Sequence, residues 1–137
     1  MELFLLTTED EALIESARKI IEKNYEDKEP YNHTVGAAVR CKDGSVYLGV
    51  NCDGVHGSCA EYIAIGAAIT DGQREFDTIV ASGREKNLVI APCGNCRQML
   101  LEYCSDTMVI LEGPDGNLAK ARITDILPLP YRYVPNN

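Results

Sequence analysis

The sequence has no long apolar run, no cluster of basic residues, and no repeat or low-complexity segment. Its first apolar run, residues 3–6, follows Glu2, so we expect neither a secretory signal nor a membrane-spanning helix. Acidic residues outnumber basic ones by 21 to 13, which gives a net charge of −8, and Lys19, Lys23 and Lys28 are interspersed with acidic residues. Because such a chain repels a phosphate backbone, we expect no nucleic-acid partner and no membrane partner.

The length of 137 residues predicts a single domain over residues 1–137, with a tail rich in proline and tyrosine at 127–137. A content of 45% hydrophobic and 25% charged residues is typical of globular proteins. Six cysteines would allow three disulfides in a small secreted protein. Without an export signal, and with enough apolar residues for a core, we favour reduced thiols in the cytoplasm.

Apolar periodicity and turn residues predict alternating helices and strands. We expect helices at residues 8–24, 59–70 and 96–103, and a single helical turn at 124–127. We expect strands at 35–40, 45–51, 77–83, 88–91, 108–112 and 118–123. Thr8 and Glu11 have the spacing of a capping box for the first helix. This order of elements predicts a layered α/β domain with a mixed sheet.

Two short segments carry candidate chemistry, Ser58-Cys59-Ala60-Glu61 and Pro92-Cys93-Gly94-Asn95-Cys96-Arg97, each at the predicted start of a helix. Cys93 and Cys96 are three residues apart, so their sulfurs can point the same way on a first helical turn. The positive end of a helix dipole lowers the pKa of a thiol. A thiolate from Cys59 would complete three ligands of a tetrahedral zinc site whose fourth position is open to water, as in catalytic sites.

Glu61 is the candidate general acid and base, because it follows the first cysteine by two positions. It would accept a proton from the water at the open position and pass it to the substrate. Residues 59 and 61 do not share a face of an ideal helix, so this role requires Cys59 to lie at the helix cap. The two helix N-termini and Arg97 would compensate the charge of three thiolates.

Alternatives exist for each group of cysteines. Cys93 and Cys96 alone would also fit a redox pair or half of a structural zinc site. The Cys59-Ala60-Glu61 segment and Pro92 favour the catalytic interpretation instead. The remaining cysteines are expected to fill strand or helix interiors as small hydrophobic residues: Cys41, Cys52 and Cys104.

With these two motifs the chain resembles the cytidine deaminase family over residues 9–133. The residues that carry the likeness are Cys59-Ala60-Glu61 and Pro92-Cys93-Gly94-Asn95-Cys96-Arg97-Gln98, with supporting matches at 35–38, 43–44, 49–51 and 127–128. The short loop between Asn51 and Cys59 and the aromatic-rich end at 127–133 are most similar to the blasticidin S deaminase branch of this family.

The resemblance implies a three-layer α/β/α domain with a five-stranded mixed sheet. It also implies one zinc ion per subunit on Cys59, Cys93 and Cys96, with Glu61 as the proton carrier. The implied substrate-binding residues are Asn51 and Asp53 for the sugar, His33 for the base, and Ala60, Tyr131 and Tyr133. Tyr62 stands where cytidine deaminases often have an arginine that compensates the thiolates, which leaves more of this task to Arg97.

The implied assembly is a homotetramer, with small residues at its centre: Ala60, Ala64, Gly66, Ala67 and Ala68. The implied reaction is hydrolytic deamination at C4 of a free cytosine nucleoside, which converts cytidine or deoxycytidine to the uracil nucleoside and ammonia. One alternative is the same chemistry on blasticidin S or another modified cytosine nucleoside. A second alternative, of a different class, is a zinc-stabilised binding protein without turnover.

Overall fold

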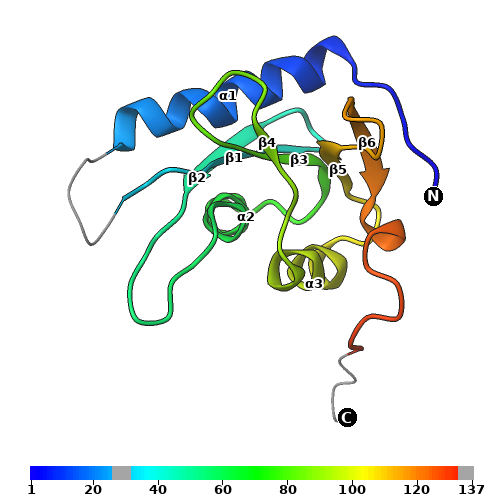
Figure 1. Cartoon of the computed structure of the whole chain (residues 1–137). Coiled ribbons are helices and arrows are strands. Elements are labelled where there is room, and N and C mark those ends of the chain that lie inside the picture. The colour runs from blue at the N-terminus through cyan, green and yellow to red at the C-terminus, as the bar shows by residue number, and fades with distance from the viewer. Residues whose placement is uncertain (26–31, 133–137) are drawn as a thin grey trace, which may run out of the picture.

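A mixed sheet lies between one helix on one face and two helices on the other in the computed structural model of the chain, which describes residues 1–25 and 32–132 (Figure 1). The helices are α1 (Thr8–Asn24), α2 (Ala60–Thr70) and α3 (Gly94–Tyr103), and the 3-10 turn η1 (Ile123–Asp125) follows the last strand. The strands are β1 (Gly36–Cys41), β2 (Val46–Val50), β3 (Phe76–Ser82), β4 (Val89–Ile90), β5 (Met108–Glu112) and β6 (Leu118–Arg122). The predicted three-layer α/β/α arrangement is confirmed.

Five strands form the sheet in the order β2-β1-β3-β5-β6, and the short β4 also pairs with β3. β3 and β5 are parallel, whereas all the other described pairs are antiparallel. Of the residues of β3, Thr78 and Ile79 pair with β5, whereas Ala81 and Ser82 farther along the strand pair with β4. The sheet therefore has one short strand more than the five that the resemblance implied.

Alternation along the strands divides the core between the two faces. Ala37, Ile79 and Val109 pack with residues of α2 and α3, whereas Ala38 and Val80 pack with residues of α1. The central strands are thus apolar on both faces, as a sheet covered by helices on both sides requires. No helix within the described residues has both the length and the hydropathy needed to cross a membrane.

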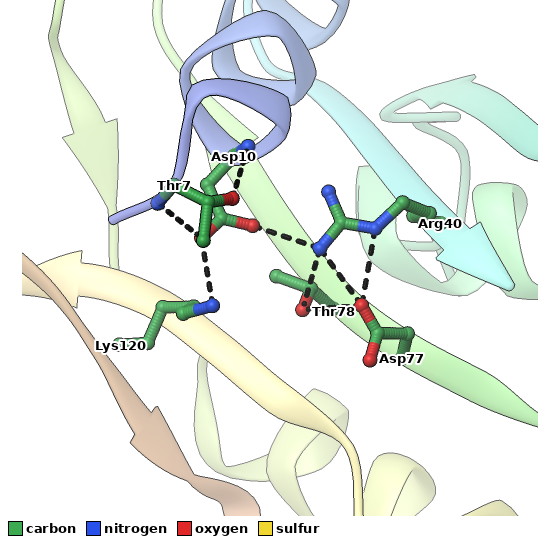
Figure 2. Close-up of polar contacts among 6 residues, drawn as sticks. All are labelled: Thr7, Asp10, Arg40, Asp77, Thr78 and Lys120. Atoms are coloured by element: carbon green, nitrogen blue, oxygen red, sulfur yellow. Dashed lines mark hydrogen bonds and ion pairs between the residues drawn. The ribbon is translucent and has the colours of Figure 1, made fainter. Parts of the chain in front are cut away.

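The capping box of α1 consists of Thr7 and Asp10, one residue earlier than predicted. The Thr7 amide donates to Asp10 Oδ2 (2.9 Å), and the Asp10 amide donates to Thr7 Oγ1 (3.2 Å). Figure 2 shows why this register prevails: the Asp10 carboxylate also contacts Arg40 (2.8 Å) and Lys120 (2.7 Å) across the sheet. The prediction of Thr8 and Glu11 was wrong because the tertiary contacts of Asp10 select between two equivalent local signals.

Arg40 extends this network to β3, where its guanidinium contacts the Asp77 carboxylate (2.7 Å) and donates to Thr78 Oγ1 (3.3 Å) (Figure 2). The side chain of Asp10 is fully buried. Burial alone would raise the pKa of Asp10, but hydrogen bonds from Lys120, the Thr7 amide and Arg40 outweigh it and lower this pKa to about 2. The network joins the start of α1 to β1, β3 and β6.

Candidate metal centre

The start of α2 presents Cys59 and Glu61 together. Cys59 is the N-cap residue and has an extended backbone (φ −67°, ψ 155°), so the helical spacing rule does not apply between positions 59 and 61. The side chain of Glu61 lies inside the protein, with 5% of the residue exposed. The requirement that Cys59 lie at the helix cap is therefore met.

The start of α3 presents the other two thiols. Cys93 is its N-cap residue, with an extended backbone (φ −68°, ψ 170°), and Cys96 is the third residue of the helix. Cys93 is exposed and Cys96 is fully buried. Within the described part of the chain, the thiol of Cys59 makes no capping bond to its own helix.

The three sulfurs lie within 4.8 Å of one another, and those of Cys59 and Cys93 are 3.6 Å apart. A tetrahedral zinc ion with Zn–S bonds of about 2.3 Å places its sulfur ligands about 3.8 Å apart. Thiolate sulfur is also the donor type that selects zinc over magnesium or calcium. The donor set and its spacing therefore fit a zinc ion on three ligands of this chain.

Burial and neighbouring groups shift the pKa of each of the three thiols. Burial opposes ionisation of Cys93, but amide groups of Cys96 and Asn95 and the neighbouring thiols outweigh it, so the pKa of Cys93 lies below its ordinary value. Burial raises the pKa of Cys96, and the negative charges of Glu61 and Cys59 raise it further. Burial likewise raises the pKa of Cys59. A bound divalent cation would reverse these two upward shifts, because it deprotonates coordinating thiols.

Burial also raises the pKa of Glu61. A carboxyl group with a raised pKa holds a proton more readily near neutral pH than an exposed one does. Such a group is suited both to accept and to release a proton during a reaction.

A second cluster joins His33, Asn51 and Asp53, the residues for which the family resemblance implied contacts with the substrate. The Asn51 amide accepts from the Val35 N–H (3.1 Å) and donates to the Asn32 carbonyl (3.1 Å) and to Asp53 Oδ1 (3.2 Å). His33 Nδ1 lies 2.6 Å from the Asn51 carbonyl. Because a carbonyl only accepts, His33 Nδ1 is the donor of this hydrogen bond. The side-chain amide of Asn51 thus joins residues 32 and 35 to Asp53. Asp53 remains exposed.

The other predicted substrate-binding residues have different surroundings. Ala60 is buried at the first position of α2. Tyr131 is 70% exposed, and its carbonyl accepts from Gln98 Nε2 (2.8 Å). Tyr133 lies outside the described residues. Contact of these three residues with a substrate stays a prediction.

The side chain of Arg97 donates to two backbone carbonyls. Its Nε lies 2.8 Å from the Pro92 carbonyl oxygen, and its Nη1 lies 2.8 Å from that of Ile126. The compensation of thiolate charge by Arg97 stays a prediction. The sequence reasoning gave no role to Gln98, although it directly follows Arg97 in the second motif.

All six cysteines are free thiols in the structure. Cys41 is buried in the core, as predicted, and Cys104 is partly buried at the end of α3. The prediction for Cys52 was wrong because this residue is exposed. A backbone pair between Cys52 and Ser58 closes the short loop before α2 and leaves Cys52 at the surface.

Residues 7–112 match the family described as "Cytidine and deoxycytidylate deaminase zinc-binding region". The chain is 38% identical over 141 residues to a blasticidin-S deaminase of Bacillus cereus, covering 96% of this chain and 98% of that one. It is 34% identical over 123 residues to a cytidine deaminase of Sporosarcina psychrophila, covering 86% and 88% of the two chains. Its fold is similar to the crystal structure of cytidine deaminase from Burkholderia pseudomallei (TM-score 0.73, 35% identity, covering 92% of this chain and 100% of that one).

Proposed function

Because the chain belongs to the cytidine and deoxycytidylate deaminase family and is a zinc-dependent hydrolase of C–N bonds, we propose that it removes the C4 amino group of a free cytosine nucleoside. The observation that carries the proposal is the gathering of three thiols at two helix starts, beside the buried carboxyl of Glu61. The net charge of −8 also disfavours a polynucleotide substrate.

In this proposal Cys59, Cys93 and Cys96 hold one zinc ion per chain. When bound, zinc supplies the Lewis acidity that makes water a nucleophile at neutral pH. The two helix N-termini direct partial positive charge toward the thiolates and so offset part of their excess negative charge.

Glu61 carries the protons of the reaction. Its buried carboxylate takes a proton from the attacking water and delivers it to N3 of the cytosine ring. After the hydroxyl has added at C4, Glu61 takes the remaining proton of this C4 hydroxyl and transfers it to the amino group, which leaves as ammonia while the C4 carbonyl forms. The raised pKa of Glu61 suits both steps, because one group must accept and then donate a proton.

The cluster of His33, Asn51 and Asp53 binds the rest of the nucleoside in this proposal. The exposed carboxylate of Asp53 accepts hydrogen bonds from sugar hydroxyls, and Asn51 holds Asp53 in place. His33 packs against the base, while Ala60, Tyr131 and Tyr133 complete the pocket. Similarity to a blasticidin-S deaminase over 96% of this chain favours blasticidin S as a second candidate substrate.

Parallel assays of cytidine, deoxycytidine and blasticidin S, followed by the ultraviolet change on deamination, test the proposed substrate class. We expect turnover of cytidine or deoxycytidine by zinc-loaded protein, and no turnover after zinc has been removed with a chelator. Turnover of blasticidin S alone would establish the second candidate. Activity on none of these compounds, with zinc bound, would refute both candidates and favour a binding protein.

We further infer that the chain forms a homotetramer in a reducing compartment such as the cytoplasm. The outer surface of α2 supports assembly, since it exposes Tyr62 and Ile63 together with the small residues Gly66 and Ala67. Three reduced thiols are needed for the zinc site, which supports the compartment. Light scattering should give four times the mass of one chain, and a monomer at micromolar concentration would contradict the assembly.

A further inference from the structure

Arg97 holds both peptide groups that flank Cys93. Its side-chain Nε donates to the carbonyl of Pro92 (2.8 Å), and its backbone N–H donates to the carbonyl of Cys93 (2.9 Å). The first bond fixes the peptide group before Cys93, and the second fixes the peptide group after it. One residue thus restrains the backbone on both sides of the exposed thiol at the start of α3.

The same guanidinium also forms a hydrogen bond to the segment that follows η1. Its Nη1 donates to the carbonyl of Ile126 (2.8 Å), a residue that packs in the same core cluster as Met99 and Leu100 of α3. Because Ile126 is held by this core packing, its carbonyl is a fixed acceptor for Arg97. The next residue of α3, Gln98, reaches farther along the terminal segment and donates to the Tyr131 carbonyl.

These bonds use the shape of the guanidinium as well as its charge. Two different nitrogens of one planar group reach two carbonyls that lie 34 residues apart in the sequence. A lysine ammonium keeps the positive charge, but it is a single point donor and does not reproduce such a fork. Substitution by lysine thus separates geometric positioning from charge compensation.

We propose that Arg97 is a positioning residue, which fixes the Cys93 ligand by joining the Pro92 carbonyl next to it to the Ile126 carbonyl. The proposal rests on the proposed zinc site and adds a role that charge alone does not supply. Groups that orient metal ligands typically contribute 10- to 100-fold to metal affinity.

The test compares the zinc affinities of Arg97→Lys, Arg97→Gln and the parent protein by competition with a chromophoric chelator. We expect both substitutions to weaken zinc binding by about 10- to 100-fold, because both remove the fork. The matched control is Arg74→Lys, since Arg74 also donates to two backbone carbonyls, those of Ile69 and Gln73, at the opposite end of α2. The control should bind zinc within twofold of the parent.

Zinc affinity of Arg97→Lys within fivefold of the parent overturns the positioning role and leaves the zinc site intact. Absence of zinc binding by the parent itself would instead refute the proposed zinc site. The absorption of cobalt-substituted protein gives a second readout, since a displaced Cys93 thiolate changes the bands of tetrahedral cobalt. We expect this change in both Arg97 variants and not in the control, and an unchanged spectrum overturns the proposal.

Gln98→Ala keeps the test decisive even if the Arg97 variants fail to fold. This substitution removes the bond to the Tyr131 carbonyl but leaves both side-chain bonds of Arg97. We expect its zinc affinity to stay within fivefold of the parent, while protease cleavage near the C-terminus becomes faster. A loss of tenfold or more in zinc affinity would assign the effect to general loosening of α3 and overturn the specific role of Arg97.

Discussion

On the α1 face of the sheet, the carboxylate of Asp10 is fully buried and contacts Arg40 and Lys120 of the same chain. On the opposite face, the thiols of Cys59 and Cys93 meet each other near the buried carboxyl of Glu61, which adds negative charge. The first region pairs the charge of Asp10 with Arg40 and Lys120 and joins four elements of the fold, although Arg40 Nη1 has no hydrogen-bond partner among the described residues. The second gathers groups that repel one another once ionised and thus favours a cation. The Asp10 network is thus suited to stabilise the fold, and the three thiols are suited to bind a cation.

The largest expected effect comes from Cys96→Ser, which removes the buried thiol of the proposed zinc site formed by Cys59, Cys93 and Cys96. We expect zinc affinity and turnover to fall more than 100-fold, since loss of a ligand exceeds the loss of a group that orients one. Metal analysis and the deamination assay measure both. Cys41→Ser is the matched control, because Cys41 is equally buried in the core. Normal zinc binding by Cys96→Ser would contradict the assignment.

Asp10→Asn should have the opposite effect: it should lower the free energy of unfolding and leave the zinc affinity unchanged. It leaves Arg40 and Lys120 without the buried carboxylate, and breaking a buried ion pair costs about 3 kcal/mol of the free energy of unfolding. Urea unfolding measures this loss, while chelator competition should give the parent's zinc affinity. A weakened zinc site with unchanged stability would break the distinction between the two regions.

Gly49→Ala tests whether the packing of β2 against α2 sets the position of Cys59 and Glu61 at the start of that helix. A Cβ at Gly49 would lie 2.7 Å from the Ala60 carbonyl oxygen and 2.5 Å from the Ala64 nitrogen, so α2 must shift. We expect a loss of about 1–3 kcal/mol in the free energy of unfolding, together with lower turnover per folded molecule. Gly54→Ala is the control, since its Cβ would have no neighbour within 4 Å. Parent-like turnover by folded Gly49→Ala would show that the start of α2 tolerates the shift.

The last expected effect, smaller than the loss in Asp10→Asn, is the acid dependence of stability that Asp10 causes. Its pKa is lowered from 3.8 to about 2 in the folded protein, so the folded state favours the ionised form. This stabilisation of about 2 kcal/mol is complete above pH 3.8 and is lost as pH falls toward 2. Unfolding of the parent and Asp10→Asn across this range should show a flatter profile for the variant. Equal slopes would contradict the role of Asp10.

The sequence was sufficient for the layers and the thiol cluster, because apolar periodicity and short motif spacing are local signals. The N-cap position of Cys59 followed from the need to bring Cys59 and Glu61 together. The capping box was placed one residue too late because the choice between Thr7 and Thr8 depends on Arg40 and Lys120, which are distant in sequence.

The bonds of Arg97 show the same limit. Its charge and its place beside Cys96 are evident in the sequence, but one of its partners, the Ile126 carbonyl, is 29 residues away. A backbone carbonyl is present at every residue, so it carries no sequence signal. The fold alone selects which carbonyl a side chain reaches.

The most direct test of the catalytic assignment is turnover and zinc content of Glu61→Gln measured on the same preparation. Glutamine keeps the size of the side chain but is neither an acid nor a base near neutral pH, so we expect turnover to fall by about 10²- to 10⁴-fold. Zinc content should equal that of the parent, and stability should not decrease, because a buried carboxyl is removed. Turnover within tenfold of the parent, with zinc bound, would contradict the role of Glu61 as the proton carrier.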